Sequence, residues 1–152
     1  HNKNIFSNVK KYEISPNTKK TISKMIFLTG PARSGTSILG NILGSAKNVE
    51  YEYEPPMLKP LLVSMESIEK EEWKKLFESY CHKELLKGRV SGRRVNFNKK
   101  DKSYVYKTSE KSKILERMSA SLKNSEFEEI SENYKLMVKI PSATTFIKRI
   151  KK

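Results

Sequence analysis

Short apolar runs and stretches of helical spacing alternate along this chain. Residues 25–29 form a continuous apolar run that stops at Gly30, which predicts a short strand buried on both faces. Ile and Leu then recur at helical spacing, which predicts a helix that starts at Thr36 or Ser37, with Gly44 as the C′ residue just after its end. The chain therefore opens with a strand, a glycine-containing loop and a helix.

The rest of the chain continues this alternation. Apolar and acidic side chains alternate over residues 49–53 before Pro55, which predicts a second strand. The clearest helix is predicted over residues 71–87, with Gly88 after its end. Weaker patterns predict a strand at 104–106, a helix at 114–122, a strand at 134–140 and a helix from 146. Strands interleaved with helices indicate an α/β fold in three layers, P-loop-like, with a mostly parallel central sheet flanked by helices.

Residues 1–23 show no sustained periodicity and contain the turn formers Pro16 and Asn17. We therefore expect a flexible N-terminal arm over 1–23 and one α/β domain over 24–152.

Composition narrows the functional classes without selecting one. Among 152 residues, 31 Lys and Arg against 17 Asp and Glu give a net charge of +14, which favours encounters with polyanions, nucleotides or anionic membranes. The single cysteine excludes an intramolecular disulfide and a zinc site built from several thiolates. No membrane span or signal peptide is visible. These features indicate a basic, cytoplasmic protein of bacterial type.

The loop Gly-Pro-Ala-Arg-Ser-Gly-Thr-Ser at 30–37 contains the two glycines of the phosphate-binding motif G-x-x-x-x-G-K-[ST]. Thr36 stands where that motif has its lysine. Loop amides and a helix N-terminus still favour an anion, and Arg33 can supply a cation. We predict a phosphate-type anion site, not an ordinary ATPase loop, formed by Arg33, Ser34, Gly35, Thr36 and Ser37. The alternative is a structural turn with Thr36 or Ser37 as helix N-cap.

The segment Arg33-Ser34-Gly35-Thr36-Ser37, followed by the apolar helix and by Glu54-Pro55, resembles the 5′-phosphosulfate loop of the sulfotransferase family. Members of this family use 3′-phosphoadenosine-5′-phosphosulfate (PAPS) as sulfuryl donor. The similarity is greatest to the tyrosylprotein, carbohydrate and bacterial branches. It covers residues 25–150, with a specific motif only at 30–55. Lys139, in Val-Lys-Ile-Pro, resembles the lysine of a later K-x-P element.

The resemblance implies transfer of a sulfuryl group from PAPS to a hydroxyl or amine of a glycan or small molecule, without a metal. It implies Glu54 as general base and assigns stabilisation of the transferring group to Arg33 and Lys139. From the residues alone, Glu54 could equally be on the solvent side of its strand with Glu50 and Glu52. Lys139 could likewise be the solvent-facing residue of an apolar strand.

This family places an Arg and a Ser for the donor 3′-phosphate beyond the K-x-P element, and the sequence stops at Lys152. We therefore expect only the N-terminal part of the family domain, which also accounts for the hydrophobic content of 36%. Arg89, Arg93 and Arg94 are candidates for gripping an acidic acceptor or the 3′-phosphate. The alternatives are a P-loop nucleotide kinase-like enzyme and a non-catalytic basic module that binds anions or nucleic acid. No specific nucleic-acid reading motif is present, and the oligomeric state is not predicted.

Overall fold

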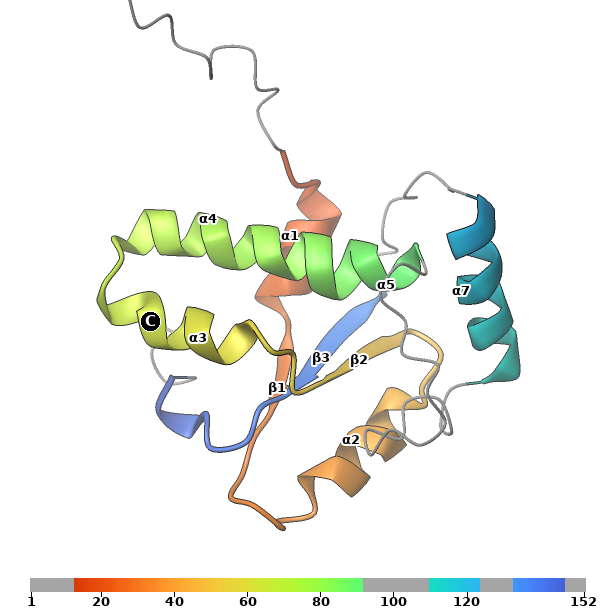
Figure 1. Ribbon diagram of the computed structural model, residues 1–152, viewed down its shortest axis with the longest axis horizontal. Coiled ribbons are helices and arrows are strands. Elements are labelled where there is room, and N and C mark those ends of the chain that lie inside the picture. The colour runs from red at the N-terminus through yellow and green to blue at the C-terminus, as the bar shows by residue number, and fades with distance from the viewer. Residues whose placement is uncertain (1–12, 92–109, 124–132, 147–152) are drawn as a thin grey trace, which may run out of the picture.

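A three-stranded parallel sheet with helices on both faces forms the centre of the molecule (Figure 1). The computed structural model describes residues 13–91, 110–123 and 133–146. The strands are β1 (Ile26–Leu28), β2 (Val49–Tyr53) and β3 (Lys135–Lys139). The helices are α1 (Pro16–Ser23), α2 (Thr36–Gly44), α3 (Leu58–Val63), the 3-10 turn η1 (Ser64–Glu66), α4 (Lys70–Tyr80), the π-helical η2 (Cys81–Lys87), α5 (Gly88–Val90) and α7 (Lys111–Lys123).

The structure is α/β, and the predicted elements that it describes agree closely with it. Strand order is β1-β3-β2, and β3 pairs in parallel with both neighbours. Between β1 and β2 the chain forms α2 on one face of the sheet, and after β2 it forms α3, α4, η2 and α5 on the side of the other face (Figure 1). Right-handed crossovers require opposite faces for two connections that run in opposite directions across one sheet. The strand predicted at 104–106 and residues 147–152 lie outside the described residues.

The prediction of a flexible arm over residues 1–23 is wrong for its second half. Residues Pro16–Ser23 form α1, and the Ser15 hydroxyl caps it by accepting a hydrogen bond from the Thr18 N–H. Ile22 belongs to the hydrophobic core, and Thr18 is 1% exposed. With one large apolar residue on its buried face, α1 has no helical stripe that a sequence pattern would detect. Residues 1–12 lie outside the described part of the chain.

The helix predicted over 71–87 is longer than its sequence pattern. Gly88 does not end it, because its φ of −59° is helical and α5 continues to Val90. Gly44 is likewise the last residue of α2 and not the residue after it. In both places a glycine was predicted to be the helix terminator, but neither adopts the left-handed conformation that this role uses.

The two faces of the sheet differ in chemistry. Register pairs Glu50 with Leu136 and Glu52 with Val138, and paired residues of neighbouring strands point to the same face. That face is covered by α1, α4, η2 and α5, and it holds the main core (Figure 1). The opposite face is covered by α2 and carries Tyr51, Tyr53, Met137 and Lys139.

Helix α2 approaches the sheet through glycine. A Cβ on Gly40 would overlap the Tyr51 ring, and one on Gly44 would lie 2.7 Å from the Tyr51 Cβ. Tyr51 is 5% exposed, whereas Ile38 and Ile42 of α2 are 67% and 63% exposed. Close contact between α2 and β2 therefore depends on the absence of side chains at two positions one helical turn apart.

Gly40→Ala is expected to destabilise the protein by about 1–3 kcal/mol, because the added methyl overpacks Tyr51. This loss opposes the gain of about 1 kcal/mol in helix propensity that alanine brings to an open helix position. Ile42→Ala, at an exposed position of the same helix, is the control. Urea unfolding measures both variants, and an unchanged or increased stability of Gly40→Ala would contradict the packing.

Candidate functional site

The loops that follow the three strands meet at one end of the sheet, where the carboxyl ends of the strands lie; we call this end the sheet edge. Leu28 and Tyr53 both pair with Lys139, so the strands end level with one another. Backbone hydrogen bonds continue past the strands: the Glu54 N–H donates to the Lys139 carbonyl (3.0 Å), and the Ser142 N–H donates to the Gly30 carbonyl (3.1 Å). The carboxyl edge of an α/β sheet is where such folds usually bind ligands.

Backbone strain is concentrated at this edge. Among the described residues, the non-glycine residues with positive φ are Arg33 (64°), Glu54 (47°) and Ser142 (55°). One of them follows each strand. Left-handed conformations are costly for residues with a Cβ, and they occur preferentially at binding and catalytic sites.

Glu54 and Lys139 are in direct contact. Lys139 Nζ lies 2.5 Å from Glu54 Oε1 and 4.3 Å from the centroid of the Tyr53 ring. The Lys139 side chain is 7% exposed, so its interpretation as a solvent-facing residue is wrong, while the Glu54 side chain is 40% exposed. The pair therefore presents a reachable carboxylate beside an ammonium group that is held by a carboxylate and an aromatic ring.

The positive φ of Glu54 accounts for this contact. Strand alternation alone would place Glu54 on the same face as Glu50 and Glu52. The left-handed turn at Glu54 interrupts the alternation immediately after β2, and its carboxylate pairs with Lys139 of the α2-covered face.

The glycine-containing loop leads directly into α2. A Cβ on Gly30 would lie 2.6 Å from Ser34 Oγ, which shows that the loop folds back over its first residue. Gly35, with a φ of 78°, is the N-cap of α2, so neither Thr36 nor Ser37 has the N-cap role proposed for it as a structural turn.

No side chain caps α2 at this N-terminus, in contrast to α1 and α4, where the side chains of Ser15 and Glu69 accept hydrogen bonds from backbone N–H groups of the first turn. The N–H groups of the first turn and the partial positive charge of the helix are therefore available to an anion. Arg33 is exposed in the same loop.

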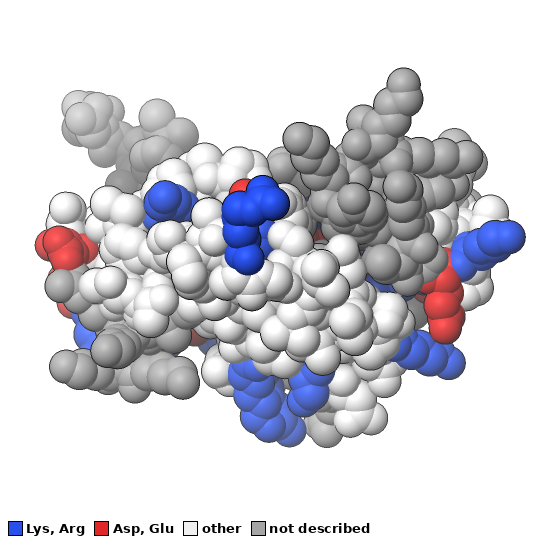
Figure 2. Space-filling model, turned by 90° about the horizontal axis from the view of Figure 1, so that it is seen from below, with Lys and Arg blue, Asp and Glu red and all other residues white. Residues whose placement is uncertain are grey.

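Among the described residues seen from the α2 side, most side chains are uncharged (Figure 2). Lys and Arg side chains lie among them, and fewer of the described Asp and Glu side chains are visible in this view (Figure 2). The exposed apolar residues of α2 are Ile38, Leu39, Ile42 and Leu43. An approaching anion therefore meets basic side chains on this side of the molecule.

Sequence patterns missed the two carboxylates on the opposite face of β2. Glu52 is 2% exposed and forms a two-point ion pair with Arg89, with Oε1–Nε and Oε2–Nη2 distances of 2.5 and 2.7 Å. Glu50 pairs with Arg117 at 2.9 Å and accepts a hydrogen bond from Tyr134. Alternation predicts solvent exposure for both glutamates. Their arginine partners, 37 and 67 residues further along, gave no local signal.

Burial raises the pKa of Glu52 from its usual 4.5 to about 7, although the Arg89 guanidinium favours the charged form. Arg89, one of the arginines considered for an acidic ligand, is instead paired within the protein. Arg93 and Arg94 lie outside the described residues.

The side chains of Glu54 and Lys139 are therefore in contact. Backbone hydrogen bonds between the ends of the strands place both residues near the loop at 30–37. Within the described ranges, no three His, Cys, Asp or Glu side chains gather as a metal site, and no helix is long and apolar enough to cross a membrane. Comparison with protein-family models, with curated proteins and with solved structures finds no match to this chain.

The raised pKa of Glu52 predicts a pH effect on stability. The folded state keeps a proton on Glu52 up to about pH 7, whereas the unfolded chain releases it near pH 4.5. The contribution of Glu52 to stability is therefore complete below pH 4.5 and is lost as the pH rises to 7, by about 3 kcal/mol. Urea unfolding between pH 4.5 and 7.5 measures the difference between the wild-type protein and Glu52→Gln.

His82, whose pKa is lowered by burial, makes the opposite contribution to the pH dependence of stability. This contribution is the same in both proteins, so it cancels when the unfolding free energy of Glu52→Gln is subtracted from that of the wild-type protein. If the stability difference instead rises with pH over this interval, pairing with Arg89 outweighs burial.

Proposed function

We propose that this protein is a PAPS-dependent sulfotransferase with a P-loop-like fold, and that the sheet edge formed by residues 30–37, Glu54 and Lys139 is its active site. The observation that carries the proposal is the contact between Glu54 and Lys139 at the edge where the uncapped α2 begins. A base, a cation and an anion-binding helix start are the three elements that sulfuryl transfer needs.

The donor phosphosulfate would bind across the loop. Amides of the first turn of α2 and the hydroxyls of Ser34, Thr36 and Ser37 would hold its oxygens, and Gly35 lets the backbone approach closely. Arg33 adds a fork of charged donors. The motif lysine is replaced by Thr36, so the second cation in this proposal is Lys139, which comes from the neighbouring strand.

Transfer moves an SO₃ group in line from the donor to the acceptor oxygen. The bond between sulfur and the bridging phosphate oxygen breaks, a new S–O bond forms, and adenosine 3′,5′-bisphosphate leaves. Glu54 takes the acceptor hydroxyl proton as that bond forms. Lys139 has three N–H donors, so it can keep its contact with Glu54 while it neutralises charge that grows on the leaving oxygen. The proposed acceptor is a glycan or small molecule.

Glu54→Gln is expected to lower the rate of sulfuryl transfer by about 100-fold or more while PAPS affinity changes little, because only the base is lost. Transfer of radiolabelled sulfate from PAPS to a panel of glycans, phenols and peptides measures the rate, and calorimetry measures binding. Glu116→Gln, on the exposed surface of α7, is the matched control. Undiminished transfer by Glu54→Gln would exclude Glu54 as the base.

Arg33→Gln is expected to weaken PAPS binding by about tenfold or more, because a charge-assisted contact with the donor is lost. Lys47→Gln, which removes an exposed cation outside the loop, should leave the affinity close to that of the wild-type protein. Titration with magnesium and ATP distinguishes the kinase-like alternative. Tight MgATP binding with no response to PAPS would replace the proposed function with that one.

A further inference from the structure

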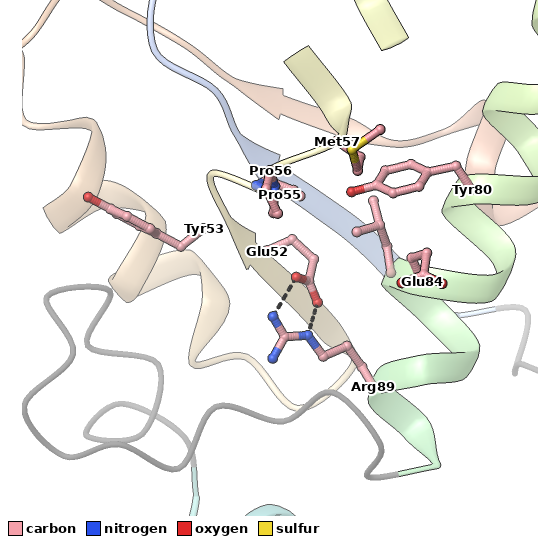
Figure 3. A pocket seen from close by; sticks show the side chains of 9 residues that line it. Glu52, Tyr53, Pro55, Pro56, Met57, Tyr80, Glu84 and Arg89 are labelled. Carbon is pink, nitrogen blue, oxygen red and sulfur yellow. Dashed lines mark hydrogen bonds and ion pairs between the residues drawn. The ribbon is translucent and has the colours of Figure 1, made fainter. Parts of the chain in front are cut away.

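A pocket of about 430 Å³ lies beside the end of β2, on the face of the sheet that α1, α4, η2 and α5 cover (Figure 3). Pro55, Pro56 and Met57, which follow β2, line it together with Tyr80 of α4 (Figure 3), and Leu85 also belongs to the lining. The volume is within the usual range for small-molecule sites. Its lining is mixed: Pro55, Pro56, Met57 and Leu85 are apolar, Tyr53 and Tyr80 are aromatic, and the remaining residues are charged.

The charged groups of the pocket are two carboxylates and one guanidinium. Glu52 and Arg89 face each other across the two contacts described above, and Glu84 adds a second carboxylate from η2 (Figure 3). Glu52 Oε2 accepts a hydrogen bond from Arg89 Nη2, whereas Oε1 lies in ion-pair contact with Arg89 Nε but has no hydrogen-bond partner. The carboxylate therefore has lone-pair directions left for a ligand donor. In a chain of net charge +14, this pocket has a local excess of acceptors.

The backbone around the pocket is also unusual. Residues Cys81–Lys87 form a π-helical segment between two α-helical ones, and such segments are rare and occur frequently at functional sites. The segment contributes Glu84 and Leu85 to the wall, and the helix continues from it to Arg89. The widened turn and the buried ion pair are thus parts of the same wall.

We propose that this pocket binds a neutral ligand that carries a hydroxyl group next to an apolar ring face, as in a phenol or a glycoside. The ring packs between Met57 and Tyr80, and the hydroxyl donates to Glu52 or Glu84. An anionic ligand is disfavoured by the two carboxylates. A cationic ligand is disfavoured because it would lie beside the Arg89 guanidinium, and because both carboxylates are already engaged within the protein, Glu52 with Arg89 and Glu84 with a contact of its own.

The pocket also borders the proposed active site. Tyr53 and Pro55 line it, and Glu54 lies between them in the chain. In a sulfotransferase the bound ligand is therefore the acceptor. That assignment rests on the proposed function, whereas binding itself does not depend on it.

Methyl NMR of the full chain with ¹³C-labelled methionine tests the pocket without PAPS. Met57 reports on the pocket, and Met118, half exposed on α7, is the internal control. The probes are phenyl β-D-glucoside, 4-methylphenol, methyl β-D-glucoside, phenyl phosphate and benzylamine. We expect phenyl β-D-glucoside or 4-methylphenol to shift Met57 saturably with a Kd of about 10 mM or lower. Phenyl phosphate and benzylamine should bind at least about tenfold more weakly.

Two of the probes distinguish a phenol ligand from a glycoside ligand, because each of them carries only one of the two groups. A shift with 4-methylphenol alone assigns a phenol, and one with methyl β-D-glucoside assigns a sugar ring. Glu84→Gln is expected to weaken the binding by about fivefold or more, whereas Glu116→Gln should not change it. Glu52→Gln is a second variant, but Glu84 is the better test because it is partly exposed, whereas Glu52 is buried against Arg89.

The pocket proposal is overturned by any of three results: no saturable Met57 shift with a neutral probe, tighter binding of phenyl phosphate or benzylamine, or equal shifts at Met57 and Met118. Failure of the proposed function gives a different result. In that case Met57 still responds to the neutral probes, while PAPS neither binds nor donates sulfate.

Discussion

Parallel pairing of β3 between β1 and β2 is the constraint on which the arrangement of this molecule depends. Lys139 is paired with Leu28 on one side and with Tyr53 on the other, so three segments that are distant in the sequence leave the sheet at the same level. The glycine-containing loop, Glu54 and the Lys-Ile-Pro segment become neighbours for this reason. A shift of one residue in the register of β3 would turn Lys139 to the opposite face and separate it from Glu54.

The same register separates two kinds of charged environment. On the α2-covered face, the one ammonium group of Lys139 is held by Glu54 and Tyr53 near solvent. On the opposite face, which α1, α4, η2 and α5 cover, Glu52 is buried against Arg89, and Glu50 is buried against Arg117. Breaking a buried pair costs more than the pair contributes over an apolar equivalent. We therefore interpret these buried pairs as fixing α5 and α7 against β2, and the pair of Glu54 with Lys139, whose carboxylate is exposed, as the one open to a ligand.

Local patterns predicted the elements and the loop but not the contacts. The strands and α2 were predicted because apolar periodicity is a local property. The loop at 30–37 was recognisable because two glycines and a strand-helix context are local as well. Helix α1 was missed because it contributes Ile22 and two threonines to the core. Burial of Glu50 and Glu52 could not be predicted, because their partners come from helices far along the chain. The sequence placed Glu54 and Lys139 in the same site only through the family resemblance, and their direct contact was not predicted.

The central claim is that this sheet edge binds a phosphosulfate donor through the start of α2. Amide NMR of the ¹⁵N-labelled chain during titration with PAPS tests it most directly, since each loop residue with an N–H reports separately. The account predicts saturable shifts of the Gly35, Thr36 and Ser37 amides, with smaller shifts at Glu54 and Lys139. Unchanged loop amides at saturating PAPS, or shifts confined to surfaces away from residues 30–37, would contradict it.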